Sequence, residues 1–318
     1  MTILKLFKLI FLLLITGTLM IGCTQDNEAS TTNNDAMTIY TTIYPIQYAA
    51  ERIGGKTVQA ASVIPPGVDA HTYEPATQDM TKIADGDAFF YLGSGMEAFA
   101  ETAASALESQ DTVLIELGQH EEIFHTENGT EHNHEDHDHH DHDHGDHNPH
   151  IWIDPLRMLD MTAVIKEELI SLNPEHEALY EENYAALEQD LKELHDAYKA
   201  VLDEKTNKRI LVSHAAFGYW ESRYGIEQIS IHGLSTSNEP SQKELTEIIH
   251  TAEEYNMDYI IFEQNVSTRV AEIIQEQIGA ESLIIHNLSV LTDEDIEADE
   301  DYLTIMEKNL ETLDQATK

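Results

Sequence analysis

Histidine is concentrated in one part of the chain. Eleven of the eighteen histidines fall between residues 120 and 150, where most of them alternate with aspartate and glutamate. Imidazole and carboxylate bind divalent transition metals, so this mixture predicts metal binding. The alternative is a solvated acidic loop that contains histidine by chance, and the alternation argues against it. Residues 120–148, called the His-rich tract below, have few apolar side chains and are expected to be disordered without metal.

The His-rich tract is expected to bind metal weakly and reversibly. Its candidate ligands stand close together among acids: His132, His134, His137, His139, His140, His142, His144 and His147. The tract indicates that the protein binds metal, but it does not show where a specific, high-affinity site lies.

Three other histidines stand at predicted strand ends or loops rather than on apolar helix faces. His71 follows a predicted strand in PPGVDAHTYEP, His150 lies between prolines in NPHIWIDP, and His214 ends the strand ILVSH. Ligands of open α/β sheets bind beyond the carboxyl ends of strands, where these residues would converge. Three imidazoles suit Zn²⁺, which takes nitrogen at about 2.0–2.1 Å, whereas Mn²⁺ and Mg²⁺ prefer oxygen. For each histidine the alternative is a hydrogen-bonded structural residue.

The five remaining histidines fall into two groups. His176, His195 and His250 lie on predicted helices with acidic neighbours and are expected to be solvated. His232 and His286 end predicted strands and stay open as candidates.

The N-terminus predicts export. Residues 1–22 have a short basic start and an apolar run typical of a secretory signal peptide, and they end in LMIGC, which resembles a bacterial lipobox with Met20 in place of the usual leucine. Cys23 is the only cysteine, so it cannot form an internal disulfide, and lipidation explains its position. The alternative is an uncleaved membrane anchor with an incidental cysteine. Residues 23–36 are small and polar and predict a flexible tether, so the body is expected outside the cytoplasmic membrane.

The charge of the mature chain restricts its partners. Residues 1–22 carry two lysines and no acid, which leaves 15 lysines and arginines against 60 aspartates and glutamates. Such a charge repels nucleic acid and anionic lipid and attracts cations. We therefore expect no nucleic-acid partner.

Short apolar strands alternate with helices, which predicts α/β structure. We expect strands at 37–42, 57–64, 88–92, 112–117, 209–213, 228–232, 259–263 and 282–286. We expect helices at 45–53, 77–84, 96–107, 155–171, 175–202, 217–224, 242–255, 268–278 and 301–313. This pattern predicts two α/β lobes, 37–172 and 205–318, with the ligand in the cleft between them. Residues 173–204 would link the lobes, with Asn173 as the helix cap; the stretch from 175 to 202 would be roughly 42 Å long at 1.5 Å per residue.

Several motifs follow one another in a recognisable order: PPGVDAHTYEP, NPHIWIDP, SHAAFGYW, GLSTSNEPS and IIFEQNVSTRVAEII. Over nearly the whole mature chain, they resemble the zinc- and manganese-type solute-binding lipoproteins of bacterial ABC importers. The resemblance implies two α/β lobes joined by a long rigid helix and one metal ion held between them. It also implies delivery of that ion to a membrane permease, with no enzymatic activity. We expect the protein to be a monomer.

The resemblance also implies the ligands and the metal. It carries the family's three histidine ligands onto His71, His150 and His214. Manganese-type relatives usually have a carboxylate where this chain has His214, whereas zinc-type relatives have histidine there and commonly a His/Asp-rich loop before the second ligand. Zinc is therefore the expected cargo.

One position departs from the family pattern. Many relatives complete the coordination with a late carboxylate, and this chain has Ser289 at the corresponding place. The fourth ligand would then be water, a residue of the His-rich tract, or Glu263 at the end of its strand. We favour water.

Two other functions are weighed against the zinc receptor. A zinc hydrolase would need a general base beside the metal-bound water. Glu74, three residues after His71, is the candidate base, but no HExxH-like pairing occurs on a helix. A surface metal buffer or adhesin would use the His-rich tract as its functional part. It would bind several metals per chain with similar weak affinities.

Overall fold

The computed structural model describes residues 36–124, 147–237, 240–265 and 269–318. The predicted signal peptide, the tether with Cys23 up to residue 35, and the His-rich tract up to residue 146 lie outside the described residues, apart from 120–124. Within the part of the chain that the structure describes, no helix is both long and apolar enough to span a bilayer.

The first lobe is built on a parallel sheet with strand order β2-β1-β3-β4. Its strand β3 is buried at all four residues, as its apolar sequence AFFY predicts for a central strand. The strands are β1 (Met37–Thr41), β2 (Val58–Ser62), β3 (Ala88–Tyr91) and β4 (Val113–Glu116), and the helices are α2 (Tyr44–Gly54), α3 (Thr77–Ala84), α4 (Ala100–Leu107) and α5 (Pro155–Leu172).

The second lobe repeats this plan with strand order β6-β5-β7-β8, again all parallel. His214 is the last residue of β5 and pairs in register with His232 of β6. The strands are β5 (Arg209–His214), β6 (Glu227–His232), β7 (Tyr259–Glu263) and β8 (Glu281–Ile285), and the helices are α7 (Gly218–Tyr224), α8 (Gln242–Glu254), α9 (Arg269–Ile278), α10 (Asp293–Glu297) and α11 (Tyr302–Ala316).

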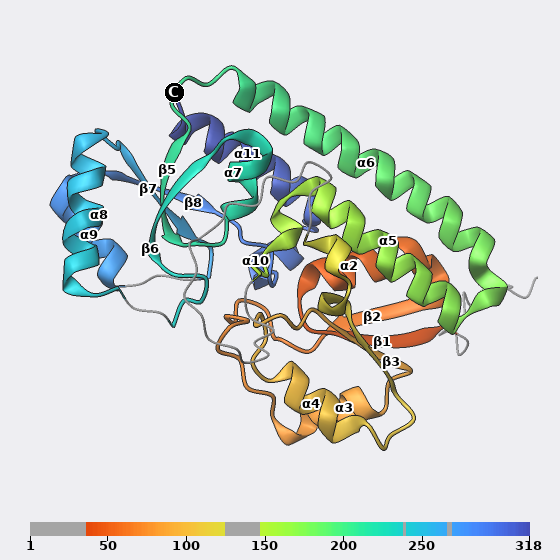
Figure 1. Cartoon of the computed structure of the whole chain (residues 1–318). Helices are drawn as coiled ribbons and strands as arrows, with labels where there is room; N and C mark the ends of the chain where they lie inside the picture. The colour runs from red at the N-terminus through yellow and green to blue at the C-terminus, as the bar shows by residue number, and fades with distance from the viewer. Residues whose placement is uncertain (1–35, 125–146, 238–239, 266–268) are drawn as a thin grey trace, which may run out of the picture. The chain divides into compact units, whose positions relative to one another are not determined.

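A long helix, α6 (Glu177–Asp203), joins the two sheets in sequence and runs along one side of both (Figure 1). Its 27 residues span about 40 Å at 1.5 Å per residue. In the first lobe Asn183 donates to the carbonyl of Ile53 at 2.8 Å, and in the second the Tyr198 hydroxyl donates to the carbonyl of Met306 at 2.7 Å. The helix therefore fixes both lobes to one rigid element. The prediction of two α/β lobes joined by a long helix is confirmed.

Some element ends differ from the prediction for local reasons. Helix α4 begins at Ala100 rather than Met96, because Gly93, Ser94 and Gly95 all adopt positive φ and form a turn after β3. The linking helix begins after a 3₁₀ turn at Pro174–His176, and the Asn173 side chain makes no capping hydrogen bond.

Several short structures were not predicted, among them α10 and a 3₁₀ turn next to His150. Helix α10 is stabilised by a capping box between Thr292 and Asp295. The residues Ile151–Ile153, just after His150, form a buried 3₁₀ turn.

Candidate metal centre

Three buried or half-buried histidines converge from separate segments. His71 lies on the loop after β2, His150 precedes the 3₁₀ turn before α5, and His214 ends β5. One ring nitrogen from each lies within 4.8 Å of the other two. Among the described residues, no other set of three or more histidine, cysteine, aspartate or glutamate side chains is arranged to hold a metal ion. The structure thus brings together the three histidines that the sequence singled out.

The spacing of the His71 and His150 rings suits a tetrahedral metal. Their Nε2 atoms are 3.1 Å apart. Two nitrogens bound to tetrahedral zinc at about 2.0–2.1 Å would lie roughly 3.3 Å apart, so little movement is needed. The other ring nitrogen of His150, Nδ1, bonds to the amide oxygen of Asn148 at 2.8 Å, which leaves Nε2 for a ligand. Sequence reasoning missed this role of Asn148, although its position two residues before a candidate ligand, in NPH, was a usable signal.

His214 has a partner on each side of its ring. Nδ1 lies 3.0 Å from Oε1 of Glu263, and Nε2 lies 2.8 Å from the carbonyl oxygen of Leu234. A carboxylate behind a histidine fixes the ring orientation and raises its basicity as a ligand. Nε2 is then the nitrogen that a metal would bind, by replacing the Leu234 carbonyl. No sequence signal identified this carbonyl, because every residue carries one.

Burial and charge act differently on the three rings. Burial, with the nearby His214, lowers the pKa of His71 and of His150, which keeps both rings in the neutral form that coordinates metal. Burial also opposes charge on His214, but the Glu263 carboxylate outweighs it and raises the pKa of His214. Burial would raise the pKa of Glu263, yet His214 and Asn287 reverse this and lower it. The site therefore holds two neutral rings beside a buried carboxylate–imidazole pair.

One of the three candidates for a fourth ligand, Glu263, already bonds to other protein groups. Both oxygens of the fully buried Glu263 carboxylate have partners, since Oε1 contacts His214 and Oε2 accepts from Asn287 Nδ2 at 2.5 Å. The Ser289 hydroxyl is buried and donates to Asn287 Oδ1 at 2.8 Å. Glu74, the acid considered as a hydrolase base, is exposed to solvent.

The remaining histidines have other environments. His232 is buried with Nδ1 2.8 Å from the carbonyl of Ser213, and His286 is buried with Nε2 3.0 Å from Asp295. His250 is exposed as expected, and His176 is half-buried. His195, expected to be solvated, is also half-buried, because its ring lies against Tyr224 with Nδ1 3.1 Å from the hydroxyl.

One candidate of the His-rich tract, His147, is among the described residues. Its ring stacks on the buried Phe124, with centroids 4.9 Å apart and an interplanar angle of 14°. Ile123 is also buried. These contacts anchor the two ends of the tract to the first lobe. The other seven tract candidates and Cys23 lie outside the described residues.

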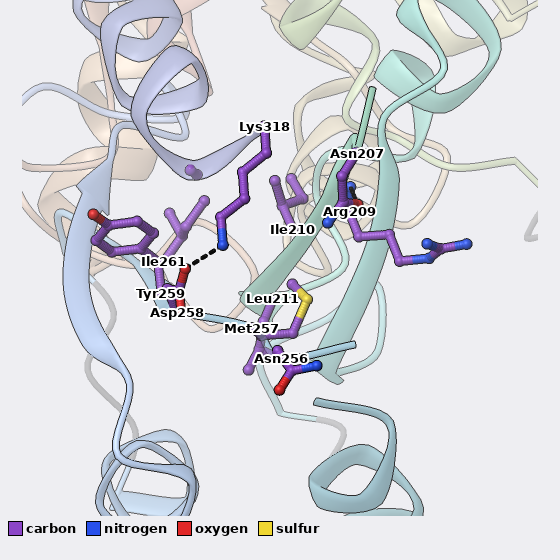
Figure 2. A pocket seen from close by; sticks show the side chains of 11 residues that line it. Asn207, Arg209, Ile210, Leu211, Asn256, Met257, Asp258, Tyr259, Ile261 and Lys318 are labelled. Carbon is purple, nitrogen blue, oxygen red and sulfur yellow. Dashed lines mark hydrogen bonds and ion pairs between the residues drawn. The ribbon is translucent and has the colours of Figure 1, made fainter. Parts of the chain in front are cut away.

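A small hollow at the opposite end of the second sheet has no histidine in its lining. It measures about 10 Å³ and lies where β5 and β7 begin, beside Arg209 and Tyr259. Figure 2 shows the Lys318 side chain reaching across it to Asp258, with which it forms an ion pair. A volume of this size holds about one water molecule. His214 and Glu263 lie at the carboxyl ends of β5 and β7, the ends away from this hollow.

Comparison with known proteins gives a consistent family assignment. Residues 39–316 match the family model described as zinc-uptake complex component A, periplasmic. The zinc-binding protein AdcA of Streptococcus pyogenes is 33% identical over 283 residues, which cover 86% of this chain and 55% of AdcA. The chain thus spans about half the length of this curated relative.

Solved structures agree with the fold. The Zn(II)-bound ZnuA-like domain of Streptococcus pneumoniae AdcA superposes with a TM-score of 0.71 at 30% identity, covering 89% of this chain and 99% of that domain. The laminin-binding protein Lmb of Streptococcus agalactiae, described as a bifunctional adhesin and metal transporter, superposes with a TM-score of 0.74 at 25% identity. This match covers 88% of this chain and 99% of Lmb.

Proposed function

Because the chain belongs to the zinc-uptake complex component A family, we propose that it is an extracytoplasmic receptor that captures Zn²⁺ and delivers it to an ABC permease. The observation that carries the proposal is the convergence of His71, His150 and His214, whose ring nitrogens lie within 4.8 Å of one another. The Zn(II)-bound domain of similar fold supports zinc as the cargo.

The three histidines act as the metal ligands, each through Nε2. Hydrogen bonds from Nδ1 to Asn148 and to Glu263 select that nitrogen in His150 and His214. Three neutral nitrogen donors favour Zn²⁺ over Mn²⁺, which prefers oxygen ligands. Water takes the fourth position, since Glu263 and Ser289 already bond to other protein groups.

The remaining parts of the chain supply location and local concentration. Cys23 carries the lipid that tethers the protein beside its permease, after removal of residues 1–22. The histidines of the His-rich tract bind Zn²⁺ weakly and raise its concentration near the first lobe, to which the tract is anchored through Ile123 and Phe124. The receptor works as a monomer, with residues 37–172 and 205–318 as its lobes.

The family is one of solute receptors, and the site supports binding without catalysis. A hydrolase needs a base that is free to take a proton from metal-bound water. Glu263 is fully buried and bonded at both oxygens, Asp69 accepts from the His71 backbone and from Thr236, and Glu74 is exposed. A receptor needs only to bind and release the ion. Glu263 contributes to binding by fixing the orientation of His214.

A competition titration tests the proposal. Zn²⁺, with Mn²⁺ in parallel, is titrated into residues 24–318 against a chromophoric chelator. We expect one tight zinc site above several weaker ones, with Mn²⁺ held poorly. Replacement of His71, His150 or His214 by alanine should abolish the tight site, whereas His250→Ala, an exposed histidine on α8, should leave it intact. Weak, multiple and unselective binding by the unmodified chain would instead support a metal buffer.

A further inference from the structure

Asn287 lies just beyond β8 and is buried next to the metal centre. Its Nδ2 donates to Glu263 Oε2 at 2.5 Å, on the carboxylate whose other oxygen contacts His214. Its Oδ1 accepts from Gln264 Nε2 at 3.0 Å and from the Ser289 backbone N–H and hydroxyl at 3.0 and 2.8 Å. Because three donors already occupy Oδ1, this oxygen has no free capacity to bind a metal.

The backbone of Asn287 reaches the other side of the site. Its carbonyl accepts from the indole Nε1 of Trp152 at 2.8 Å. The Trp152 ring is fully buried and lies against the ring of His150, with centroids 5.4 Å apart. Asn287 therefore contacts Trp152, which lies against His150, through its backbone. Through its side chain it contacts Glu263, which lies against His214.

The amide contact to Glu263 controls which way the carboxylate points. A hydrogen bond to an ionised group is stronger than one between neutral groups, and this one is buried. Without it, Oε2 would be left unpaired in the interior, a costly state that rotation of the carboxylate would relieve. Such a rotation would also move Oε1 away from His214 Nδ1.

From these contacts we propose that Asn287 is a positioning residue for zinc. Its side chain holds the Glu263 carboxylate, and through that carboxylate the His214 ring. Its backbone carbonyl holds the Trp152 side chain, which lies beside His150. The inference rests on the proposed function, because it assumes that His150 and His214 bind the ion. It assigns a role to a residue that contacts neither ligand directly.

The test compares two buried asparagines. Asn287→Leu removes the donor to Glu263 at similar volume, and Asn309→Leu is the matched control. Asn309 is also buried, but its amide bonds to the backbone of His286 and to Met306 rather than to Glu263. Both variants should lower the Tm of the metal-free protein. Only Asn287→Leu should weaken zinc binding, by about 10- to 100-fold, as loss of an outer partner of a metal ligand typically does.

Two further readouts separate positioning from general destabilisation. In the Glu263→Gln background, Asn287→Leu should add little to the loss of zinc affinity, because the carboxylate through which it acts is gone. With Co²⁺ as a spectroscopic probe, Asn287→Leu should change the visible bands of the bound ion, and Asn309→Leu should not. If Asn287→Leu unfolds the chain, Asn287→Ser is used, which retains a hydroxyl too short to reach Glu263.

The proposal is overturned if Asn287→Leu, or Asn287→Ser in its place, lowers the Tm while zinc affinity and the Co²⁺ spectrum match those of the control. Full additivity with Glu263→Gln would also overturn it. Failure of the proposed function gives a different result, since the unmodified chain itself would then lack a tight zinc site that depends on His214.

Discussion

His214 and Glu263 form a buried pair in which the ring Nδ1 lies 3.0 Å from the carboxylate Oε1. Their side chains are 2% and 0% exposed, so water screens the interaction very little. The pair raises the pKa of His214 and lowers that of Glu263, although burial alone would shift each in the opposite direction. The same pairing fixes the ring so that Nε2 is presented to a metal. Glu263 is thus placed to support His214 as a proposed ligand rather than to serve as one itself.

Glu263→Gln should weaken zinc binding by about 10- to 100-fold without abolishing it, since the amide retains the shape but loses the charge that increases the basicity of His214. His214→Ala should cost more, because a ligand is removed outright. Chelator competition measures both variants against the unmodified chain. Equal and complete loss of zinc binding in both would mean that Glu263 itself coordinates the metal.

Deletion of residues 125–146 should leave the tight zinc site intact. The three proposed ligands, His71, His150 and His214, lie outside the deleted segment, whereas most of the weaker candidates lie inside it. We expect the number of weakly bound zinc ions per chain to fall while the tight Kd stays close to that of the full chain. Isothermal titration calorimetry resolves the two classes of site. A loss as large as that of His71→Ala would show that the tract contributes a ligand.

Zinc should stabilise the folded protein by an amount that grows with the logarithm of its concentration relative to its Kd. A ligand that binds only the native state adds about 2.7 kcal/mol to the free energy of unfolding at 100 times its Kd. Removal of zinc by a chelator should therefore lower the Tm, and His150→Ala should remove this dependence. Differential scanning calorimetry with and without zinc measures it. An unchanged Tm for the unmodified chain at saturating zinc would contradict a native-state site.

A second buried carboxyl group should make stability depend on pH. Burial raises the pKa of Glu97 from its ordinary 4.5 to about 7, while Thr42 and the backbone N–H groups of Leu92 and Gly93 partly oppose the shift. A raised carboxyl pKa means that stability is full below pH 4.5 and is lost as the pH rises through about 7. Glu97→Gln abolishes this ionisation. As the pH rises from 4.5 to about 7, the free energy of unfolding of Glu97→Gln should therefore increase relative to that of the unmodified chain. The expected change is roughly 3 kcal/mol, at 1.36 kcal/mol per pKa unit. Urea denaturation at several pH values measures it, and a difference that does not vary with pH would mean that Glu97 keeps its ordinary pKa.

The sequence pointed to the three proposed ligands but not to the residues that contact and position them. His71, His150 and His214 stand out because they follow strand ends or lie between prolines, and parallel strands bring such ends together. The supporting contacts join residues far apart in the chain, such as Trp152 and Asn287, which are separated by 135 positions. Such pairs leave no local pattern. The late start of α4 has a local cause instead: Gly93, Ser94 and Gly95 all adopt positive φ, in a turn where Glu97 accepts from the N–H groups of Leu92 and Gly93.

The pH dependence of zinc binding should proceed in two stages rather than one. Zinc competes with protons for ring nitrogens, so affinity falls wherever a free ligand is protonated. His214 has a pKa raised above the ordinary 6.5, so it binds its proton first as the pH falls, and zinc binding then displaces one proton. The pKa values of His71 and His150 are lowered, so these rings take up protons only below 6.5. The plot of log Kd against pH should therefore have a slope of about one proton just above 6.5 and steepen below it. Glu263→Gln should move the first stage to lower pH and leave the second in place. A single steep transition near 6.5, unchanged in Glu263→Gln, would contradict this prediction. It would show that the three histidines are protonated together and that the Glu263 carboxylate does not make His214 the first to bind a proton.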